Sequence, residues 1–254
     1  MKPTQPGFRQ EFREFLRYIK HPTLGPRRPH RGGGNGWWKD WAPGIPFFRL
    51  LQWAACLWLI NIFVLAPIAL LVATKSGATH RLDMNNIPFL TAVLWAPVAE
   101  ELLFRFFLRR PVPGLWVIPI MAVVVMVGPE LYSIVMLLLV LTMIVLFDIW
   151  RFTTYEHALK WQWRVNYQKF FPLVFHGSVL AFAAVHLWNY SFNAINWWLM
   201  PLLVLPQWFT GMVLAWMRVR DGIASAIIMH MIFNSGPILL VWFLLQFSPE
   251  LAVS

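Results

Sequence analysis

The stretch that decides the fold is IPFLTAVLWAPVAEELLFRFFL, which runs from Ile87 to Leu108. It is long enough to cross a bilayer as one helix, yet its apolar run carries Glu100, Glu101 and Arg105. Ionisable side chains are costly inside the hydrocarbon region, so they face a protein interior, pair with a partner and serve a function. This stretch therefore predicts a membrane helix that contributes to a buried polar site.

The composition of the whole chain favours the same environment. Of its 254 residues, 59% are apolar and 13% are charged, and 16 are Trp and 21 are Phe. These proportions exclude an ordinary soluble domain, and we expect no nucleic-acid partner. The single cysteine, Cys56, excludes a disulfide framework and a Cys-rich metal site.

We predict an all-α, polytopic transmembrane bundle of about seven to eight helices. The apolar spans that we expect are Leu50–Thr74, Ile87–Leu108, Leu115–Val127, Leu131–Phe147, Phe170–Trp188, Ala194–Trp216 and Ile223–Phe247. The membrane-embedded domain then occupies residues 47–254, and it follows a basic arm and linker at residues 1–46.

The basic arm shows two stripes at helical spacing. The apolar stripe contains Phe8, Phe12, Phe15, Leu16 and Ile19, and the basic stripe contains Arg9, Arg13, Arg17 and Lys20. This pattern predicts an amphipathic helix on the membrane surface, with its basic side chains against anionic lipid. A solvated helix or a disordered tail is the alternative. Interfacial aromatic anchors are expected at Trp37, Trp38 and Trp41.

Lys and Arg gather on one side of the predicted topology. That side holds the arm, Arg109 and Arg110, the basic segment 151–169, and Arg218 and Arg220. The opposite loops keep only Lys75 and Arg81. The positive-inside rule therefore predicts a multi-pass integral membrane protein with a cytoplasmic N-terminus, and we expect a bacterial inner membrane.

The first polar constellation lies in the opening stretch. Glu101 and Arg105 are four residues apart and share a helix face, whereas Glu100 points about 100° away. An ion pair can therefore neutralise Glu101 and leave Glu100 unpaired. Pro97 cannot donate to the carbonyl of Val93, which loosens the helix nearby. The alternative is a buried salt-bridge cluster that only holds helices together.

The second constellation is His186, which follows Phe182 by four residues on a predicted helix. Gly177 and Ala181 precede the pair and would permit a close helix approach. A lone histidine in a membrane helix often only bonds to a neighbouring helix, so His186 by itself is weak evidence. His176 falls on the opposite side of its helix, and we interpret it as a bystander.

The third constellation is His230 with Asn234, four residues apart on one helix face. The small residues Gly222 and Ala226 continue the same stripe and favour tight packing. This helix would therefore present an imidazole and an amide to one cavity.

Together these residues can hydrolyse an amide. Glu100 would act as general base toward water, and His186 would orient that water or pass a proton to the leaving amine. His230 and Asn234 would donate hydrogen bonds to the oxyanion. Zinc is the alternative, held by Glu100, His186 and His230. However, the chain has no HExxH pattern, and Asn is a poor zinc ligand, so we expect no metal cofactor.

These motifs resemble those of a known family, the CAAX proteases and bacteriocin-processing enzymes, also called the Abi family of intramembrane proteases. The family pattern is EExxxR, then FxxxH, then HxxxN or HxxxD. The chain has EELLFR at Glu100–Arg105, FAAVH at Phe182–His186 and HMIFN at His230–Asn234, in the same order. The resemblance implies a protease-like core at about 87–236, with water activation by Glu100 and oxyanion stabilisation by His186, His230 and Asn234.

The resemblance also implies an activity and a substrate class. We expect an intramembrane endopeptidase that acts on a membrane-associated peptide or protein, with Glu101 and Arg105 as supporting residues. Glu100 and His186 lie 86 residues apart, wider than is usual in the family, which implies that the segment Leu115–Phe147 is an insertion. The alternatives are an ion- or proton-coupled transporter and a non-catalytic immunity or scaffold protein of the same fold.

Overall fold

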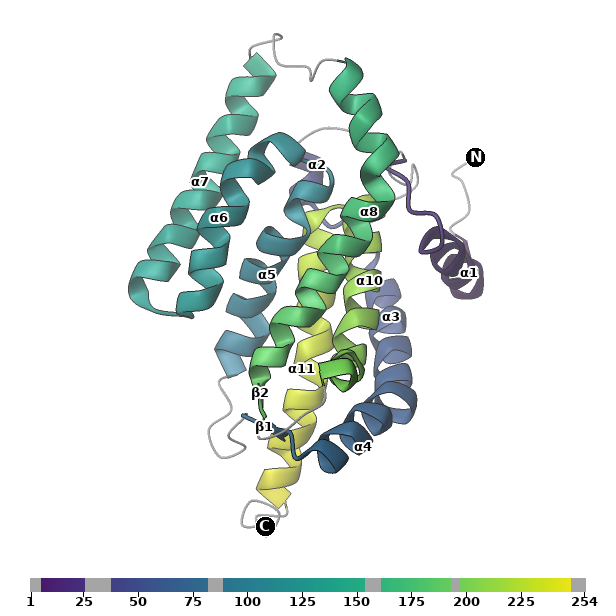
Figure 1. The fold of residues 1–254 in the computed structure, drawn as a ribbon. Coiled ribbons are helices and arrows are strands. Elements are labelled where there is room, and N and C mark those ends of the chain that lie inside the picture. Colours follow the sequence, from purple (N-terminus) through teal and green to yellow (C-terminus); the bar gives the residue numbers. More distant parts are fainter. Residues whose placement is uncertain (1–5, 26–37, 82–88, 154–160, 193–196, 248–254) are drawn as a thin grey trace.

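The protein is an all-α helical bundle, as predicted, in a computed structural model that describes residues 6–25, 38–81, 89–153, 161–192 and 197–247 (Figure 1). Trp37, the first two residues of the span that begins at Ile87, and the C-terminal end of the membrane domain lie outside the described residues.

The helices of the described residues are numbered in chain order. They are α1 (Phe8–Tyr18), α2 (Trp38–Trp41), α3 (Phe47–Ile60), α4 (Ala66–Ser76), α5 (Ala96–Phe104), α6 (Pro111–Val127), α7 (Leu131–Thr153), α8 (Trp161–Val185), α9 (Met200–Leu203), α10 (Leu205–Asp221) and α11 (Ile223–Phe247). Two π-helical turns, Asn61–Leu65 and Thr91–Trp95, precede α4 and α5, and 3₁₀ turns occupy Phe106–Leu108, His186–Asn189 and Trp197–Leu199. Strands β1 (Thr79–His80) and β2 (Tyr190–Ser191) pair antiparallel, with Thr79 opposite Ser191.

Several helices are suited to a bilayer, so the chain is a multi-pass membrane protein. Within the described ranges, four helical segments are long and apolar enough to cross: Phe47–Ser76, Leu131–Trp150, Gln162–Asn189 and Ile223–Leu240. A fifth forms if Trp197–Leu203 and Leu205–Asp221, which meet at a bend of 54°, count as one broken span. The other two predicted spans correspond to the short helix α6 and to Thr91–Phe104, which combines a π turn with α5.

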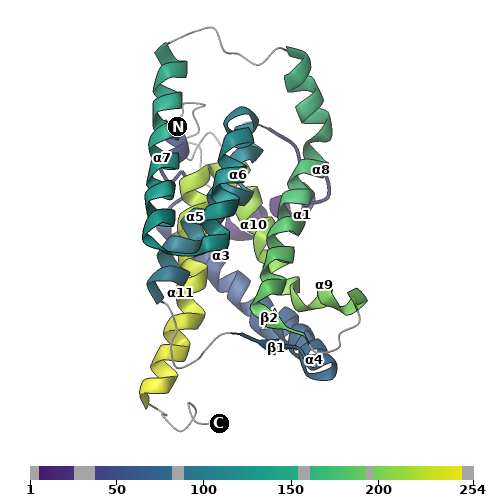
Figure 2. The same ribbon diagram turned by 60° about the vertical axis from the view of Figure 1, so that its left-hand side comes forward.

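The bundle has a lateral extension. The α6–α7 hairpin stands on one side of α5, whereas α3, α8, α10 and α11 lie on its other side (Figures 1 and 2). Buried side chains of α5 and the hairpin, including Leu102, Val117 and Val140, form an apolar cluster of their own. The α6–α7 hairpin therefore packs against α5.

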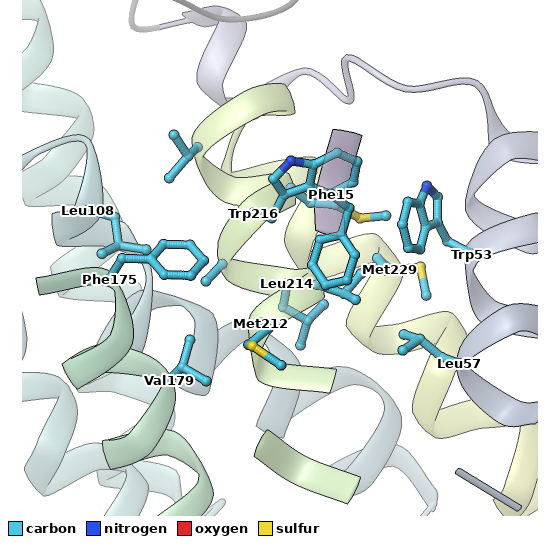
Figure 3. Packing of buried hydrophobic residues seen from close by; sticks show 14 of the residues in the cluster. Phe15, Trp53, Leu57, Leu108, Phe175, Val179, Met212, Leu214, Trp216 and Met229 are labelled. Atoms are coloured by element: carbon cyan, nitrogen blue, oxygen red, sulfur yellow. The ribbon is translucent and has the colours of Figure 1, made fainter. Parts of the chain in front are cut away.

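The main core is aromatic and includes the N-terminal arm. The Phe15 side chain is fully buried, and its ring centroid lies 5.5 Å from the rings of both Trp53 and Trp216 (Figure 3). Phe8 and Phe12 also contact Trp53, with ring centroids at 5.2 and 5.9 Å. Helix α1 thus packs its apolar face on α3 and α10.

This packing corrects the prediction that the apolar face of the arm enters the membrane interface. The indole rings of Trp53 and Trp216 give that face a protein surface to cover. Glu11 is buried with it and accepts a hydrogen bond of 2.9 Å from Trp53 Nε1. The basic stripe at Arg9, Arg13, Arg17 and Lys20 remains exposed. Trp41 is half-buried against the Phe106 ring, so it is a packing residue as well.

Helices α3 and α11 meet at a very close contact. A Cβ atom added to Gly236 would lie 2.3 Å from Trp58 Cζ2, so only glycine fits there. Trp58 Nε1 donates a 3.0 Å hydrogen bond to the carbonyl of Phe233. In an α-helix that carbonyl would accept from residue 237, but Pro237 has no N–H. The indole therefore satisfies a carbonyl that the proline leaves free.

Candidate active site

The three predicted motifs come together inside the bundle. Glu100 and Glu101 lie on α5, His186 begins the 3₁₀ turn after α8, and His230 and Asn234 lie on α11. A cavity of about 240 Å³ is lined by Asn61, Phe182, His186, Pro206, Gln207, Thr210, His230, Phe233 and Asn234. Three of the four predicted catalytic residues thus line one cavity, and Glu100 borders it through His230.

The predicted ion pair between Glu101 and Arg105 is present and fully buried. Arg105 Nη1 donates to Glu101 Oε1 at 2.8 Å. The guanidinium also lies over the ring of Phe182, 3.7 Å from its centroid. Gly211 on α10 permits this arrangement, because a Cβ atom there would lie 3.0 Å from the Phe182 ring. The supporting pair therefore links α5 to α8 and α10.

His230 lies between two carboxylates, a relation that sequence spacing did not predict. Its Nδ1 is 2.9 Å from Glu101 Oε1, and its Nε2 is 3.8 Å from Glu100 Oε2. A carboxylate accepts, so Nδ1 carries a proton and the ring is fixed in one orientation. Nε2 is then the nitrogen that faces Glu100. Nε2 can donate only when the ring is protonated on both nitrogens.

Glu100 differs from its neighbour as predicted, because no arginine pairs with it in the described residues. Its Oε2 atom is buried and makes no hydrogen bond within the part of the chain that the structure describes. The side chain keeps 18% of its surface exposed, whereas Glu101 is fully buried. Glu100 is therefore the glutamate of the pair that has no arginine partner among the described residues and that keeps part of its side chain exposed.

His186 is oriented by its own helix. Its Nδ1 lies 2.8 Å from the carbonyl of Phe182, which can only accept, so Nδ1 carries a proton. Neutral His186 therefore has a lone pair on Nε2. The ring of Phe182 separates the two histidines, with centroids 4.6 Å from His186 and 5.9 Å from His230. Both imidazoles thus flank one phenylalanine at the cavity.

The helix that carries His186 starts earlier than the predicted apolar span Phe170–Trp188. Helix α8 begins at Trp161 and gives way to a 3₁₀ turn at His186, which lines the cavity together with His230. The predicted start of that span was wrong. Polar residues such as Gln162, Arg164 and Asn166 continue the helix beyond the apolar run.

Asn234 is held by a carbonyl that Pro97 leaves free. Ala96 N–H bonds to Thr91, five residues earlier, so the next residue, Pro97, would bond to Ala92 if it had an N–H. Asn234 Nδ2 donates to this Ala92 carbonyl at 2.9 Å. The sequence had assigned the free carbonyl to Val93, one residue later, because it assumed α-helical spacing. The second Nδ2 proton of Asn234 is not used by this bond.

Other predicted features of these helices have simpler roles. His176 is half-buried beside the Phe175 ring and does not line the cavity. Gly177 is exposed, and a Cβ atom there would meet nothing within 4 Å, so the predicted close approach at Gly177 is wrong. Gly222 precedes α11 with φ of 107°, which favours glycine, and Ala226 is fully buried, as tight packing requires.

Sequence reasoning missed three polar side chains of the cavity lining. These are Asn61, Gln207 and Thr210, and Asn61 Nδ2 donates to Leu57 O at 2.8 Å and to Thr210 Oγ1 at 3.4 Å. A usable signal existed, because Asn61 is a strongly polar side chain inside an apolar run. It stood alone, without a second polar residue one helical turn away.

The described side chains are not arranged as the zinc alternative requires. Within the described ranges, no three side chains of His, Cys, Asp or Glu are grouped as a metal ion requires. The set Glu100, His186 and His230 thus does not fit a zinc site as it stands, and no step is assigned to zinc.

Comparison of the chain with family models, with curated proteins and with solved structures finds no match.

Proposed function

We propose that the protein is an intramembrane endopeptidase of the type that its motifs resemble, the CAAX-protease and bacteriocin-processing family. One observation carries the proposal: a hydrogen-bonded Glu101 and an open Glu100 flank His230, whose ring shares a cavity with His186 and Asn234. Its substrate would be a membrane-associated peptide or protein whose backbone enters that cavity.

The first chemical step would be attack by water. Glu100 would remove a proton from a water molecule held near His186 Nε2, and the water oxygen would form a bond to the carbonyl carbon of the substrate. The carbonyl oxygen then becomes an oxyanion. His230 Nε2 and the second Nδ2 proton of Asn234 would donate to it, and each donor is worth about 3 to 4 kcal/mol in comparable sites. Glu101 and Ala92 fix these donors.

The second step would break the C–N bond. The proton taken up by Glu100 returns to the leaving nitrogen, directly or through His186, while the oxyanion collapses to a carboxylic acid. The products are a new carboxyl terminus and a new amine terminus. Arg105 does not touch the reacting atoms in this scheme, and it acts by holding the Glu101 carboxylate in place.

The test compares membrane fractions from cells that express the wild type or Glu100→Gln. We expect at least one peptide terminus that the wild type produces and that Glu100→Gln reduces by about 10² to 10⁴-fold. Terminal proteomics of the membrane fraction measures it. The substrate identified in this way then gives kcat and KM for purified protein, with and without a chelator.

The matched control is Glu130→Gln, which changes an exposed glutamate at the start of the α7 segment. It should cleave as the wild type does. Equal cleavage by Glu100→Gln would remove the proposed base, and loss of activity on chelation would restore the metal scheme. Ion flux into proteoliposomes, with no cleavage of any peptide, would favour the transporter instead.

We also propose that the end of the bundle that holds α1 and α2 faces the cytoplasm of a bacterial inner membrane. Exposed Arg and Lys side chains gather there on α1 and on the first turns of α8, whereas Lys75 and Arg81 are the exposed basic side chains described at the other end. The exposed stripe of α1 would meet anionic lipid headgroups. Flotation with vesicles of phosphatidylglycerol and of phosphatidylcholine, with the stripe changed to Gln, tests this contact.

A further inference from the structure

The lining of the cavity also contains a buried amide whose oxygen accepts no hydrogen bond within the described residues. Asn61 begins the π-helical turn Asn61–Leu65 between α3 and α4, and 8% of its surface is exposed. Its Oδ1 atom is buried and has no hydrogen-bond partner within the described residues. Such a group in an apolar wall is costly unless something donates to it.

The orientation of this amide is fixed by its surroundings. The carbonyl of Leu57 can only accept, so the group 2.8 Å from it must be the Nδ2 end of Asn61. Thr210 Oγ1 accepts from the same end at 3.4 Å. Oδ1 therefore cannot exchange places with Nδ2, and Asn61 presents a pure acceptor.

Gln207 adds a second acceptor from another helix. It lines the same cavity from the first turn of α10, just after the 54° bend, and its Oε1 is also buried without a partner among the described residues. Pro206, Phe182 and Phe233 supply apolar surface between the polar groups. The site thus combines two neutral acceptors with apolar walls.

We infer that Asn61 Oδ1, with Gln207, forms a subsite that accepts backbone N–H groups of an extended apolar peptide beside the bond to be cleaved. The inference rests on the proposed function and adds the recognition of its substrate. An extended segment suits these acceptors, because its N–H groups are free, whereas those of a helix interior are already bonded within the helix. The apolar walls select small or medium apolar side chains next to those N–H groups.

The cavity lies where two helices are discontinuous, which fits the same role. Asn61 stands at the π turn that leads into α4, and Gln207 stands just after the break between α9 and α10. Irregular backbone at membrane depth is tolerated where it lines a cavity. Both breaks border the space that the peptide would enter.

The test measures binding, so it does not depend on cleavage. The probe is a dansylated heptapeptide of alternating Ala and Leu, titrated into full-length Glu100→Gln protein in detergent. Its analogues each replace one amide N–H by an ester oxygen, which removes one donor and little else. We expect one or two analogues to bind about five- to tenfold more weakly, the usual effect of one neutral hydrogen bond.

That sensitivity should vanish when Asn61→Leu is added, because the acceptor is then absent. Thr142→Val is the matched control: it changes an exposed threonine of α7, which does not line the cavity, and should leave the ester effect intact. If Asn61→Leu does not purify as a folded protein, Asn61→Ala replaces it. Thermal unfolding of each variant reports its folding.

Two outcomes overturn the inference: every ester analogue binds as the parent peptide does, or the ester effect persists unchanged without the Asn61 acceptor. Failure of the proposed function looks different. If binding is ester-sensitive through Asn61 but the wild type cleaves no peptide, the subsite is supported and the proposed protease activity is contradicted. If the wild type cleaves the heptapeptide but no ester analogue binds more weakly, the protease activity is supported and the subsite is contradicted.

Discussion

Two of the buried groups of charged side chains in this bundle differ in how many of their polar atoms form hydrogen bonds. The end cluster joins α2, α6, α7 and α10 and consists of Asp40, Arg110, Asp148 and Arg218. The site cluster joins α5 and α11 and consists of Glu100, Glu101, Arg105 and His230. Both contain acids and bases in close contact, so their residue types alone do not separate them.

In the end cluster, bonds run in several directions from Asp40, Arg110 and Arg218. Arg218 donates to Asp40 Oδ1 at 2.5 Å and to the carbonyls of Arg105 and Phe106 at 3.1 and 3.0 Å. The other carboxylate oxygen of Asp40 accepts from Arg110 Nε at 3.0 Å, and Arg110 also bonds to Asp148. These bonds hold the linker helix α2 and the 3₁₀ turn after α5 against α10.

The site cluster contains four buried atoms with no hydrogen-bond partner in the described residues: Glu100 Oε2, Glu101 Oε2, Arg105 Nε and Arg105 Nη2. Arg105 compensates in part by its contact with the ring of Phe182. Native proteins rarely leave such groups open, and they do so mostly at sites with a function. Within the described residues, the candidate active site is therefore distinguished by its buried polar atoms without hydrogen bonds and not by its charged residue types.

Arg218→Leu would break the end cluster and should give the largest effect on stability. The change leaves Asp40 buried without its closest cation and leaves two carbonyls without their donor. Removal of one partner of a buried pair costs about 3 to 5 kcal/mol. Chemical unfolding in detergent measures the loss. Arg164→Leu, on the exposed first turns of α8, is the control and should leave the unfolding midpoint unchanged.

The neighbouring glutamates of the site cluster give the second prediction. Glu101→Gln should lower the free energy of unfolding by about 3 kcal/mol, because Arg105 then stays buried beside a neutral amide. Glu100→Gln should leave that free energy within about 0.5 kcal/mol of the wild type while it abolishes cleavage. Unfolding and cleavage are measured on the same preparations. Equal destabilisation by the two changes would mean that Glu100 is as structural as Glu101.

Much of this arrangement could be predicted from spacing. Helical geometry alone separates Glu100 from the Glu101–Arg105 pair, and the structure has that pair at 2.8 Å. The all-α bundle follows from the long apolar runs. Contacts within a single helix could therefore be predicted, because they depend only on the fixed rise and turn of the helix.

Contacts between distant segments could not be predicted in the same way. The contact of His230 with Glu101 spans 129 positions, and that of Arg218 with Asp40 spans 178. The amphipathic pattern of α1 does not say whether lipid or protein covers its apolar face, since both are apolar. The π turn at Thr91–Trp95 shifted the free carbonyl from Val93 to Ala92, because pattern reasoning assumes regular helices.

Gly236→Ala tests whether the candidate active site depends on the close spacing of α3 and α11. The added Cβ would overlap Trp58 and push α3, with Asn61, away from α11, with Asn234. We expect a loss of about 1 to 3 kcal/mol in stability and a rise in KM for any cleaved peptide. The control is Gly177→Ala, whose Cβ meets open space and should be neutral. Equal effects of both changes would contradict the close contact as a determinant of the site.

Trp58→Phe should have the smallest effect on stability, because it removes only one neutral hydrogen bond, the one from the Trp58 indole to the Phe233 carbonyl. The phenyl ring keeps most of the packing on Gly236 but cannot donate to the Phe233 carbonyl. We expect a loss of about 1 kcal/mol in the free energy of unfolding. Since that carbonyl is free only because Pro237 has no N–H, Pro237→Ala would supply an internal donor. The same Trp58→Phe change should then cost less, and an undiminished cost would show that the indole acts through packing alone.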